Sequence, residues 1–233
     1  MREQPKKIAG LDVLEFSQGE GTPCVVLLHG FGANFLDLAP LSQVVATERK
    51  LSWVFPNAPL EVPLGIVGTG RAWFPLDVSE FERAAMAGTH PDFSPDTPHG
   101  FLEMSETVGR FLSELERKYR PLYVGGFSQG AMVACDAVLS RESNAAGLLL
   151  LSGNLVARER WERLAQKHRR LRVFQSHGTH DTLLSPRGAK ALHDLLARNG
   201  LDCEFHEFPG GHEIPTEILS KLSRFLVAES PGT

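Results

Sequence analysis

The stretch Gly126-Phe127-Ser128-Gln129-Gly130 places a serine between two glycines, with one residue on either side. This spacing is typical of the sharp strand-to-helix turn that exposes a nucleophilic serine above a sheet, where a side chain at either glycine would collide with neighbouring backbone. Apolar residues of strand type precede the motif, and the positive end of the helix that follows would face an oxyanion formed at the serine. Ser128 is therefore the candidate nucleophile of an acyl-transfer reaction.

A serine hydroxyl needs a base, and histidine is suited to take its proton near neutral pH. Nine histidines are present. In α/β hydrolases the base follows the serine and the acid, on a loop after a later strand. His212 fits this order because it follows a predicted strand ending at Phe208 on a glycine-flanked loop, although an ordinary surface histidine is the alternative. His206 lies inside that strand, and His168 and His193 lie on predicted helices.

The acid is expected on the loop after the preceding strand, which reads HGTHDTLL from residue 177. Asp181 is the only carboxylate there, and it would hold the imidazole in one tautomer and stabilise the imidazolium. Asp202 is the alternative partner. His177, His180 and Asp181 are also conceivable metal ligands, but no second cluster with ligand spacing completes such a site. The sequence therefore favours a reaction that uses no metal.

The reaction also needs hydrogen-bond donors for the oxyanion. The glycine-containing stretch LLHGFG, residues 27–32, follows an early predicted strand and is equivalent to the loop that supplies such donors in esterases. The backbone amides of Phe31 and Gln129 are the predicted oxyanion hole. For this stretch taken alone, a plain glycine turn is the less favoured alternative.

The elements that must position these residues alternate between strands and helices. Predicted strands cover residues 11–16, 24–30, 51–56, 122–127, 147–153, 171–178 and 203–208, and predicted helices cover about 36–46, 100–119, from 129, 159–167, 186–198 and 216–227. Continuous apolar strands are typical of a parallel sheet covered on both faces. The pattern predicts an α/β fold with a doubly wound, mostly parallel sheet, in a single domain over residues 1–233.

The segment from about residue 56 to 98 interrupts this alternation and is rich in proline and glycine. A loop this long inside a compact domain is usually functional or disordered, and its apolar content argues against disorder. Because prolines lack an amide donor, we expect it to cover the site rather than join the sheet. Its predicted pocket-lining residues are Leu64, Val67, Trp73 and Phe74. The alternative is that the two aromatic residues only anchor the loop to the core.

Composition narrows the class of protein. The formal net charge of -4 leaves no basic excess to neutralise phosphates, so nucleic acid is not an expected partner. The sequence has neither an apolar run of membrane-spanning length nor a signal peptide, and we expect a cytoplasmic protein. Three widely spaced cysteines indicate reduced thiols rather than a disulfide framework.

Taken together, these motifs resemble the acyl-protein thioesterase and small carboxylesterase (phospholipase/carboxylesterase) family of α/β hydrolases. The resemblance runs nearly end to end, through LLHGFGAN followed by Asp37, then FPNAP, RAWFPLD, GFSQGA, LSG, HGTHD and GGHEIP. It implies an α/β-hydrolase fold without a cofactor, acting on small-molecule acyl esters or acylated proteins, in some members as a homodimer. RAWFPLD is two residues longer than the family's WFD form, in the region that shapes the acyl pocket.

Four functions remain open on the sequence. The leading hypothesis is a serine carboxylesterase that cleaves acyl esters or thioesters through Ser128, His212 and Asp181. A protein depalmitoylase or lysophospholipase would use the same residues with a longer pocket, and acyl transfer to an alcohol would use the same acyl-enzyme. A catalytically silent binding protein belongs to a different class, and it usually lacks a triad member. All three candidates are present here.

Overall fold

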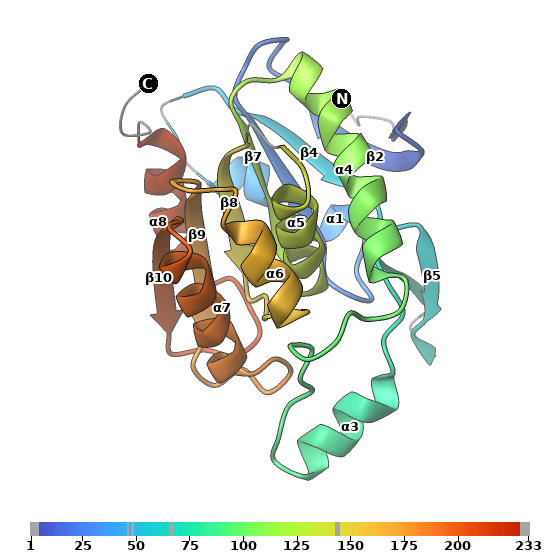
Figure 1. The fold of residues 1–233 in the computed structure, drawn as a ribbon. Coiled ribbons are helices and arrows are strands. Elements are labelled where there is room, and N and C mark those ends of the chain that lie inside the picture. The colour runs from blue at the N-terminus through green and yellow to red at the C-terminus, as the bar shows by residue number, and fades with distance from the viewer. Residues whose placement is uncertain (1–4, 46, 48, 66–67, 143–144, 229–233) are drawn as a thin grey trace.

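The computed structural model describes residues 5–45, 47, 49–65, 68–142 and 145–228 (Figure 1). A central eight-stranded sheet has the order β1-β2-β4-β3-β7-β8-β9-β10. β1 and β2 pair antiparallel, as do β2 and β4, whereas the pairs from β4 across to β10 are parallel. The strands are β1 Lys6–Ile8, β2 Leu11–Phe16, β3 Cys24–Leu28, β4 Ser52–Pro56, β7 Leu122–Phe127, β8 Ala145–Leu151, β9 Arg172–Gly178 and β10 Asp202–Phe208.

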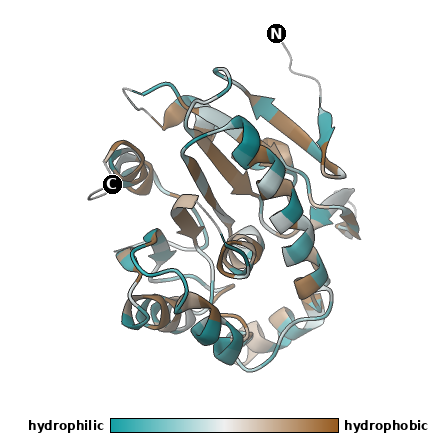
Figure 2. Ribbon diagram, turned by 45° about the horizontal axis from the view of Figure 1, so that its top comes forward, coloured by the Kyte–Doolittle hydropathy of each residue, from teal (hydrophilic) through white to brown (hydrophobic). Residues whose placement is uncertain are grey.

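Helices cover both faces of this sheet. The helices of the described ranges are α1 Phe35–Leu38, α2 Leu41–Val44, α3 Val78–Met86, α4 Phe101–Lys118, α5 Gln129–Leu139, α6 Arg158–Ala165, α7 Pro186–Arg198 and α8 Thr216–Val227, of which α3 does not pack on the sheet. One core cluster joins alternate strand residues to α4, α5, α6 and α7, and a second joins the opposite strand residues to α1 and α8. Figure 2 shows the resulting layers, with apolar strands inside. The predicted doubly wound, mostly parallel sheet is confirmed.

The central strands β3 and β8 are apolar on both sides because each face of the sheet meets helices. In β3, Cys24, Val26 and Leu28 belong to the first core cluster, and Val25 and Leu27 belong to the second. All five are buried. This two-sided burial explains why the strand is uninterruptedly hydrophobic rather than alternating.

The predicted helix at about 36–46 was wrong. The structure instead has two single-turn helices, α1 and α2, separated at Pro40. Proline has no amide hydrogen to continue the helical ladder, and its ring clashes with the preceding turn. The side chain of Asn34 caps α1 by accepting a hydrogen bond from the amide of Leu36.

The segment at 56–98 contains strands and a helix that the sequence pattern did not predict. β5 Leu60–Pro63 and β6 Thr69–Ala72 pair antiparallel as a separate two-stranded sheet, and α3 follows them. The segment stays outside the main sheet, as its prolines predicted. In Figure 1, α3 extends away from the body of the molecule. None of the described residues of α3 is buried.

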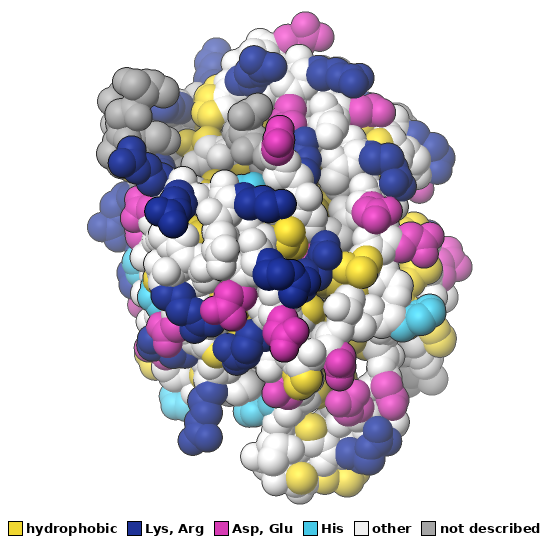
Figure 3. All heavy atoms as spheres, in the orientation of Figure 1, with side chains coloured by type: hydrophobic (Ala, Val, Ile, Leu, Met, Phe, Trp, Pro, Cys, Tyr) yellow, Lys and Arg dark blue, Asp and Glu magenta, His cyan; other side chains and the backbone are white. Residues whose placement is uncertain are grey.

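The surface drawn in Figure 3 carries Lys and Arg interspersed with Asp and Glu. Apolar side chains gather at the end formed by α3, where Val78 and Met86 are 52% and 86% exposed. Within the described ranges, we find no helix with the length and apolar character needed to span a membrane.

Candidate active site

The three residues predicted to do chemistry follow strands of the parallel part of the sheet. Ser128 comes directly after β7, Asp181 follows β9, and His212 follows β10. Because these strands are parallel, their carboxyl ends meet at one edge, which is where open α/β sheets place their sites. The sheet topology therefore brings together residues that are 31 to 84 positions apart in the chain.

Ser128 lies in a backbone conformation that a side chain rarely adopts, with φ 55° and ψ −120°. Its amide donates a hydrogen bond to the carbonyl of Leu151, at 2.9 Å, which fixes the turn against β8. The flanking glycines are required by close packing. A Cβ atom on Gly126 or Gly130 would lie 2.5 Å or 2.2 Å from the carbonyl oxygen of Leu28. Strain held in place by surrounding structure is a feature of functional turns.

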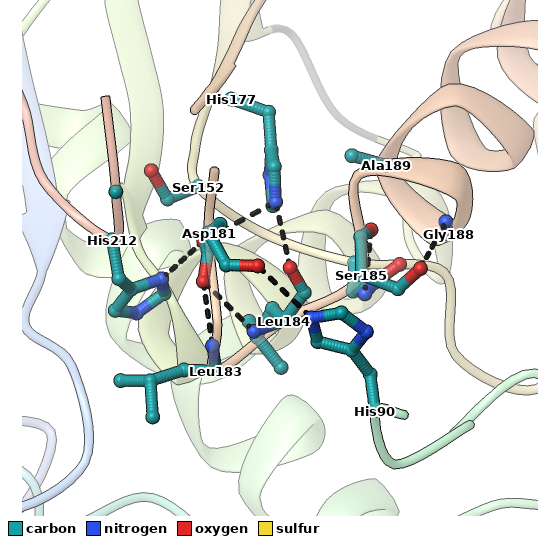
Figure 4. A network of polar contacts seen from close by, with 12 residues as sticks. His90, Ser152, His177, Asp181, Leu183, Leu184, Ser185, Gly188, Ala189 and His212 are labelled. Carbon is teal, nitrogen blue, oxygen red and sulfur yellow. Dashed lines mark hydrogen bonds and ion pairs between the residues drawn. The ribbon is translucent and has the colours of Figure 1, made fainter. Parts of the chain in front are cut away.

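Asp181 and His212 are hydrogen-bonded, with Nδ1 of the imidazole 2.6 Å from Oδ2 of the carboxylate (Figure 4). The other carboxylate oxygen accepts hydrogen bonds from the amides of Leu183 and Leu184, at 2.8 and 3.0 Å. Burial alone would raise the pKa of Asp181, but hydrogen bonds from His177 and His212 outweigh burial and hold its pKa well below its usual range. Asp181 is therefore an anion at neutral pH.

The imidazole of His212 is oriented by contacts on two sides. Its Nδ1 is bonded to Asp181, and its ring packs at 4.7 Å between centroids against Phe127. With Nδ1 engaged, Nε2 is the ring nitrogen left to exchange a proton. His212 and Ser128 line the same cavity. The structure thus brings all three predicted triad residues to one place.

The two predicted oxyanion donors also border this cavity. Phe31 lies in the loop after β3, and Gln129 is the first residue of α5. The amide of a first helical residue has no partner within its own helix and points along the positive end of the helix dipole. Both positions suit a group that receives negative charge.

The side chain of Gln129 has a second task that the sequence did not reveal. Its Oε1 accepts a hydrogen bond from the amide of Trp73 at 2.8 Å, and its Nε2 donates to the carbonyl of Phe74 at 2.7 Å. The carboxamide is buried, with the residue 1% exposed. Gln129 therefore attaches the covering segment to the nucleophile turn.

The predicted pocket lining differs from the structure. Trp73 and Phe74 are fully buried and belong to the core cluster rather than the lining of the cavity at Ser128. The indole Nε1 of Trp73 donates to the carbonyl of His29, and the ring of Phe74 meets Phe101 edge to face. Large aromatic side chains gain more from burial in the core, where the indole N–H also finds an acceptor, than from a place at the opening of the cavity.

The other two predicted lining residues also require revision. Leu64 packs over Gly32, where its side chain would be 3.3 Å from an added Cβ, and it does not line the cavity. Val67 lies outside the described residues. The hairpin β5–β6 thus supports the oxyanion loop from outside, since the amide of Gly32 donates to the carbonyl of Arg71.

The cavity itself has a volume of about 280 Å³ and is mostly apolar. Its lining consists of Gly30, Phe31, Ala33, Asp37, Leu76, Val78, Phe81, Phe93, Phe127, Ser128, Gln129, Met132, Leu183, Leu184 and His212. The segment at 56–98 does cover the site, but through residues that follow Phe74. Val78 and Phe81 are spaced i, i+3 and so share one face of α3, which was the available signal in the sequence, whereas Leu76 precedes the helix. The carboxylate of Asp37 also borders the cavity, and burial raises its pKa.

The covering segment is fastened to the rest of the site at its far end. The carbonyls of Phe93 and Ser94 accept hydrogen bonds from the amides of Ala157 and Arg158, at 3.0 and 2.8 Å. Nε2 of His90 lies 2.9 Å from the main-chain carbonyl of Asp181. The wall of the cavity is thereby tied to both α6 and the loop of the acid.

His29 is a buried histidine that supports the oxyanion loop. Its Nδ1 lies 2.7 Å from the carbonyl of Gly30, and its Nε2 lies 3.1 Å from the amide of Ala58. Since a backbone amide can only donate, Nε2 accepts and Nδ1 carries the hydrogen. Burial lowers the pKa of His29 to about 4, so the ring is neutral near pH 7.

Comparison with known proteins decides the family. The family model described as phospholipase/carboxylesterase matches residues 11–230. The chain belongs to the phospholipase/carboxylesterase family. Within this family it is 29% identical over 219 residues to acyl-protein thioesterase 1 of Debaryomyces hansenii, covering 87% of this chain and 89% of that protein. It is 24% identical over 221 residues to carboxylesterase SOBER1 of Arabidopsis thaliana, covering 90% and 91%.

Solved structures with similar folds agree with the assignment. The crystal structure of esterase PE8 superposes with a TM-score of 0.74 at 27% sequence identity, over 92% of this chain and 95% of that one. Acyl-protein thioesterase 2 of Zea mays gives a TM-score of 0.72 at 22% identity, over 92% and 96%. The predicted family and α/β-hydrolase fold are both confirmed, and the relatives identify this phospholipase/carboxylesterase family member as an esterase or thioesterase hydrolase.

Proposed function

We propose that this protein is a serine carboxylesterase that hydrolyses acyl esters or thioesters through Ser128, His212 and Asp181. The observation that carries the proposal is the arrangement around one cavity. A serine in strained backbone geometry and an imidazole bonded at 2.6 Å to a buried carboxylate line the same apolar space. This is the set of groups that nucleophilic acyl transfer requires.

The proposed reaction has two halves. Ser128 Oγ attacks the acyl carbon while Nε2 of His212 takes the hydroxyl proton, and the amides of Phe31 and Gln129 stabilise the oxyanion. The bond to the leaving alcohol or thiol then breaks, and His212 returns the proton to that group. Water attacks the resulting acyl-enzyme with His212 again as base, which releases the carboxylic acid and restores the serine. Asp181 keeps Nδ1 protonated throughout and stabilises the imidazolium.

The cavity supports an acyl chain as the group bound next to the serine. Its lining is largely aliphatic and aromatic, with polar groups concentrated at the catalytic side chains. At about 280 Å³ it lies at the small end of ligand pockets, which favours acyl chains of short or medium length. An acyl-protein thioesterase activity is the second candidate, favoured by the names of several relatives. A cytoplasmic location and a homodimer remain predictions.

Covalent labelling tests the proposal. A fluorophosphonate probe should label Ser128, and Ser128→Ala should abolish labelling and lower kcat on p-nitrophenyl esters by about 10⁴ to 10⁶-fold. Ser220→Ala, on the exposed side of α8, is the matched control and should keep full activity. Hydrolysis or labelling that survives in Ser128→Ala would show that another residue is the nucleophile, and an inactive wild type would favour a binding protein.

A further inference from the structure

The carboxylate of Asp181 is bound by two imidazoles, of which only His212 borders the cavity. The second is His177, near the end of β9, whose side chain is 1% exposed. Its Nε2 lies 3.2 Å from Oδ2 of Asp181 and 3.1 Å from the carbonyl oxygen of Leu184. Figure 4 shows the two histidines on opposite sides of the carboxylate. The same oxygen, Oδ2, is therefore shared by both rings.

The hydrogen bonds assign the tautomer of His177. Both neighbours of Nε2 are acceptors, so Nε2 carries the hydrogen and donates to them. Nδ1 is buried and has no hydrogen-bond partner among the described residues. His177 is thus a donor to Asp181 through Nε2.

This donor completes the positioning of the acid. Oδ1 is held by the amides of Leu183 and Leu184. Without His177, Oδ2 would be fixed only by His212, which gains and loses a proton twice in each proposed catalytic cycle. A second donor to Oδ2 holds this oxygen in place in both protonation states of His212. It also spreads the negative charge of the carboxylate over four hydrogen bonds, which keeps Asp181 from taking the proton of His212.

We propose that His177 is a positioning residue for catalysis, which holds the carboxylate of Asp181 in the orientation that His212 requires. The inference rests on the proposed function, because a role in orienting the acid has meaning only if His212 acts as the base. Leu184 gives the contact a second consequence. Its side chain lines the cavity and its carbonyl binds His177, so the same N–H joins the acid to the cavity wall.

Two substitutions separate positioning from packing. In His177→Gln the side-chain amide nitrogen reaches about as far as Nε2 and can donate to Asp181, whereas in His177→Asn the amide stops short by about one bond. Both replacements are polar, neutral and smaller than imidazole. Loss of a group that orients a catalytic residue typically costs about 10 to 100-fold. We expect His177→Asn to lose that much in kcat with KM changed less than about threefold, and His177→Gln to recover most of it.

The pH profile is a readout that packing alone would not move. The titratable side chains in contact with Asp181 are His177 from β9, His212 from the loop after β10 and, at its main-chain carbonyl, His90 from the segment after α3. Removing the donor at His177 makes the carboxylate a stronger partner for the imidazolium. The pH at which kcat/KM reaches half of its plateau should rise by about 0.5 to 1 in His177→Asn and stay unchanged in His177→Gln.

A half-buried histidine away from the site serves as control. His193 on α7 also has an unpaired Nδ1 and stacks on Phe205. His193→Gln should leave both kcat and the pH profile unchanged. Equal losses in His177→Asn and His177→Gln, or a pH profile that does not move in either, would overturn the positioning role and leave His177 a packing residue.

One measurement needs no substitution and no activity. Nitrogen-15 chemical shifts of the wild-type imidazoles report which ring nitrogen carries the hydrogen, and we expect a hydrogen at Nε2 of His177. Protonation at Nδ1 alone would contradict the inference even if the variants fail to fold. The outcome is distinct from failure of the proposed function, in which the wild type would neither hydrolyse esters nor react with the fluorophosphonate at Ser128.

Discussion

Replacing Asp181 by asparagine tests how the acid works, because the structure leaves the amide no good orientation. Asp181 accepts two backbone amides at Oδ1 and two imidazoles at Oδ2. Asparagine offers one oxygen and one NH₂ group. If its oxygen stays on the amides of Leu183 and Leu184, its NH₂ faces His212 and His177. If it is rotated, its NH₂ faces the two amides.

The first orientation has a defined chemical consequence. His212 can meet an NH₂ group only if Nδ1 becomes an acceptor, which moves the ring hydrogen to Nε2. Nε2 then cannot take the serine proton, and we expect kcat to fall about 10⁴-fold, the size of the effect known for this change of tautomer in serine proteases. The unpaired buried donors should also lower the free energy of unfolding by about 1 to 3 kcal/mol at pH 7.

The assay is kcat/KM on a short p-nitrophenyl ester, with urea denaturation of the same samples. Asp202→Asn is the matched control, since Asp202 was the alternative acid in the sequence. It starts β10, six residues before Phe208, which places it about 20 Å from the strand end that leads to His212. Asp202→Asn should be fully active. If Asp181→Asn kept more than a tenth of the wild-type activity, Asp181 would not be the orienting acid.

Trp73→Ala removes a fully buried indole and should lower the free energy of unfolding by about 3 to 5 kcal/mol, measured by urea denaturation, without changing the preferred acyl length. Phe93→Ala on the cavity wall should lengthen the preferred acyl chain in a series of esters. A shifted chain-length preference in Trp73→Ala alone would mean that Trp73, and not Phe93, lines the pocket. The free energy of unfolding should fall as the pH drops from about 6.5 towards 4, because burial lowers the pKa of His29 to about 4 while the unfolded ring takes up a proton near 6.5. The urea midpoint should depend less steeply on pH in His29→Gln, and an unchanged pH dependence would exclude His29 as its source. Ester hydrolysis should be indifferent to EDTA, since backbone amides polarise the carbonyl, and loss of activity restored by one added metal would contradict this.

The triad candidates were accessible from the sequence because their order and their loops follow from strand periodicity. Ser128 has glycines on both sides for reasons of backbone contact that any GxSxG turn shares. Asp181 and His212 were located by the loops that they occupy, and the structure then placed them at bonding distance. The parallel sheet was equally accessible, since its strands are buried on both faces and read as continuous apolar runs.

The lining of the pocket was not accessible, because it depends on side-chain direction in an irregular segment. Trp73 looks like a pocket residue by type, but a buried carboxamide from Gln129 binds its backbone and turns the indole into the core. No periodicity predicts that contact across 56 residues. From the sequence, His177 is only a conceivable metal ligand. Asp181 can be identified as the triad acid by its loop, but the loop does not show that His177 contacts it.

Gln129 binds the backbone at Trp73 and Phe74 and so fixes the start of the segment that forms the cavity wall. The residues of this wall can therefore change without moving the candidate catalytic residues. The chain is next secured at Phe93 and Ser94, by hydrogen bonds from the start of α6. The residues between these two attachments, α3 included, can be replaced together by another sequence. The replacement must keep the contact of His90 with the main chain of Asp181, or supply an equivalent one. Directed evolution of substrate range would therefore do best to randomise residues 76–89, in length as well as in sequence.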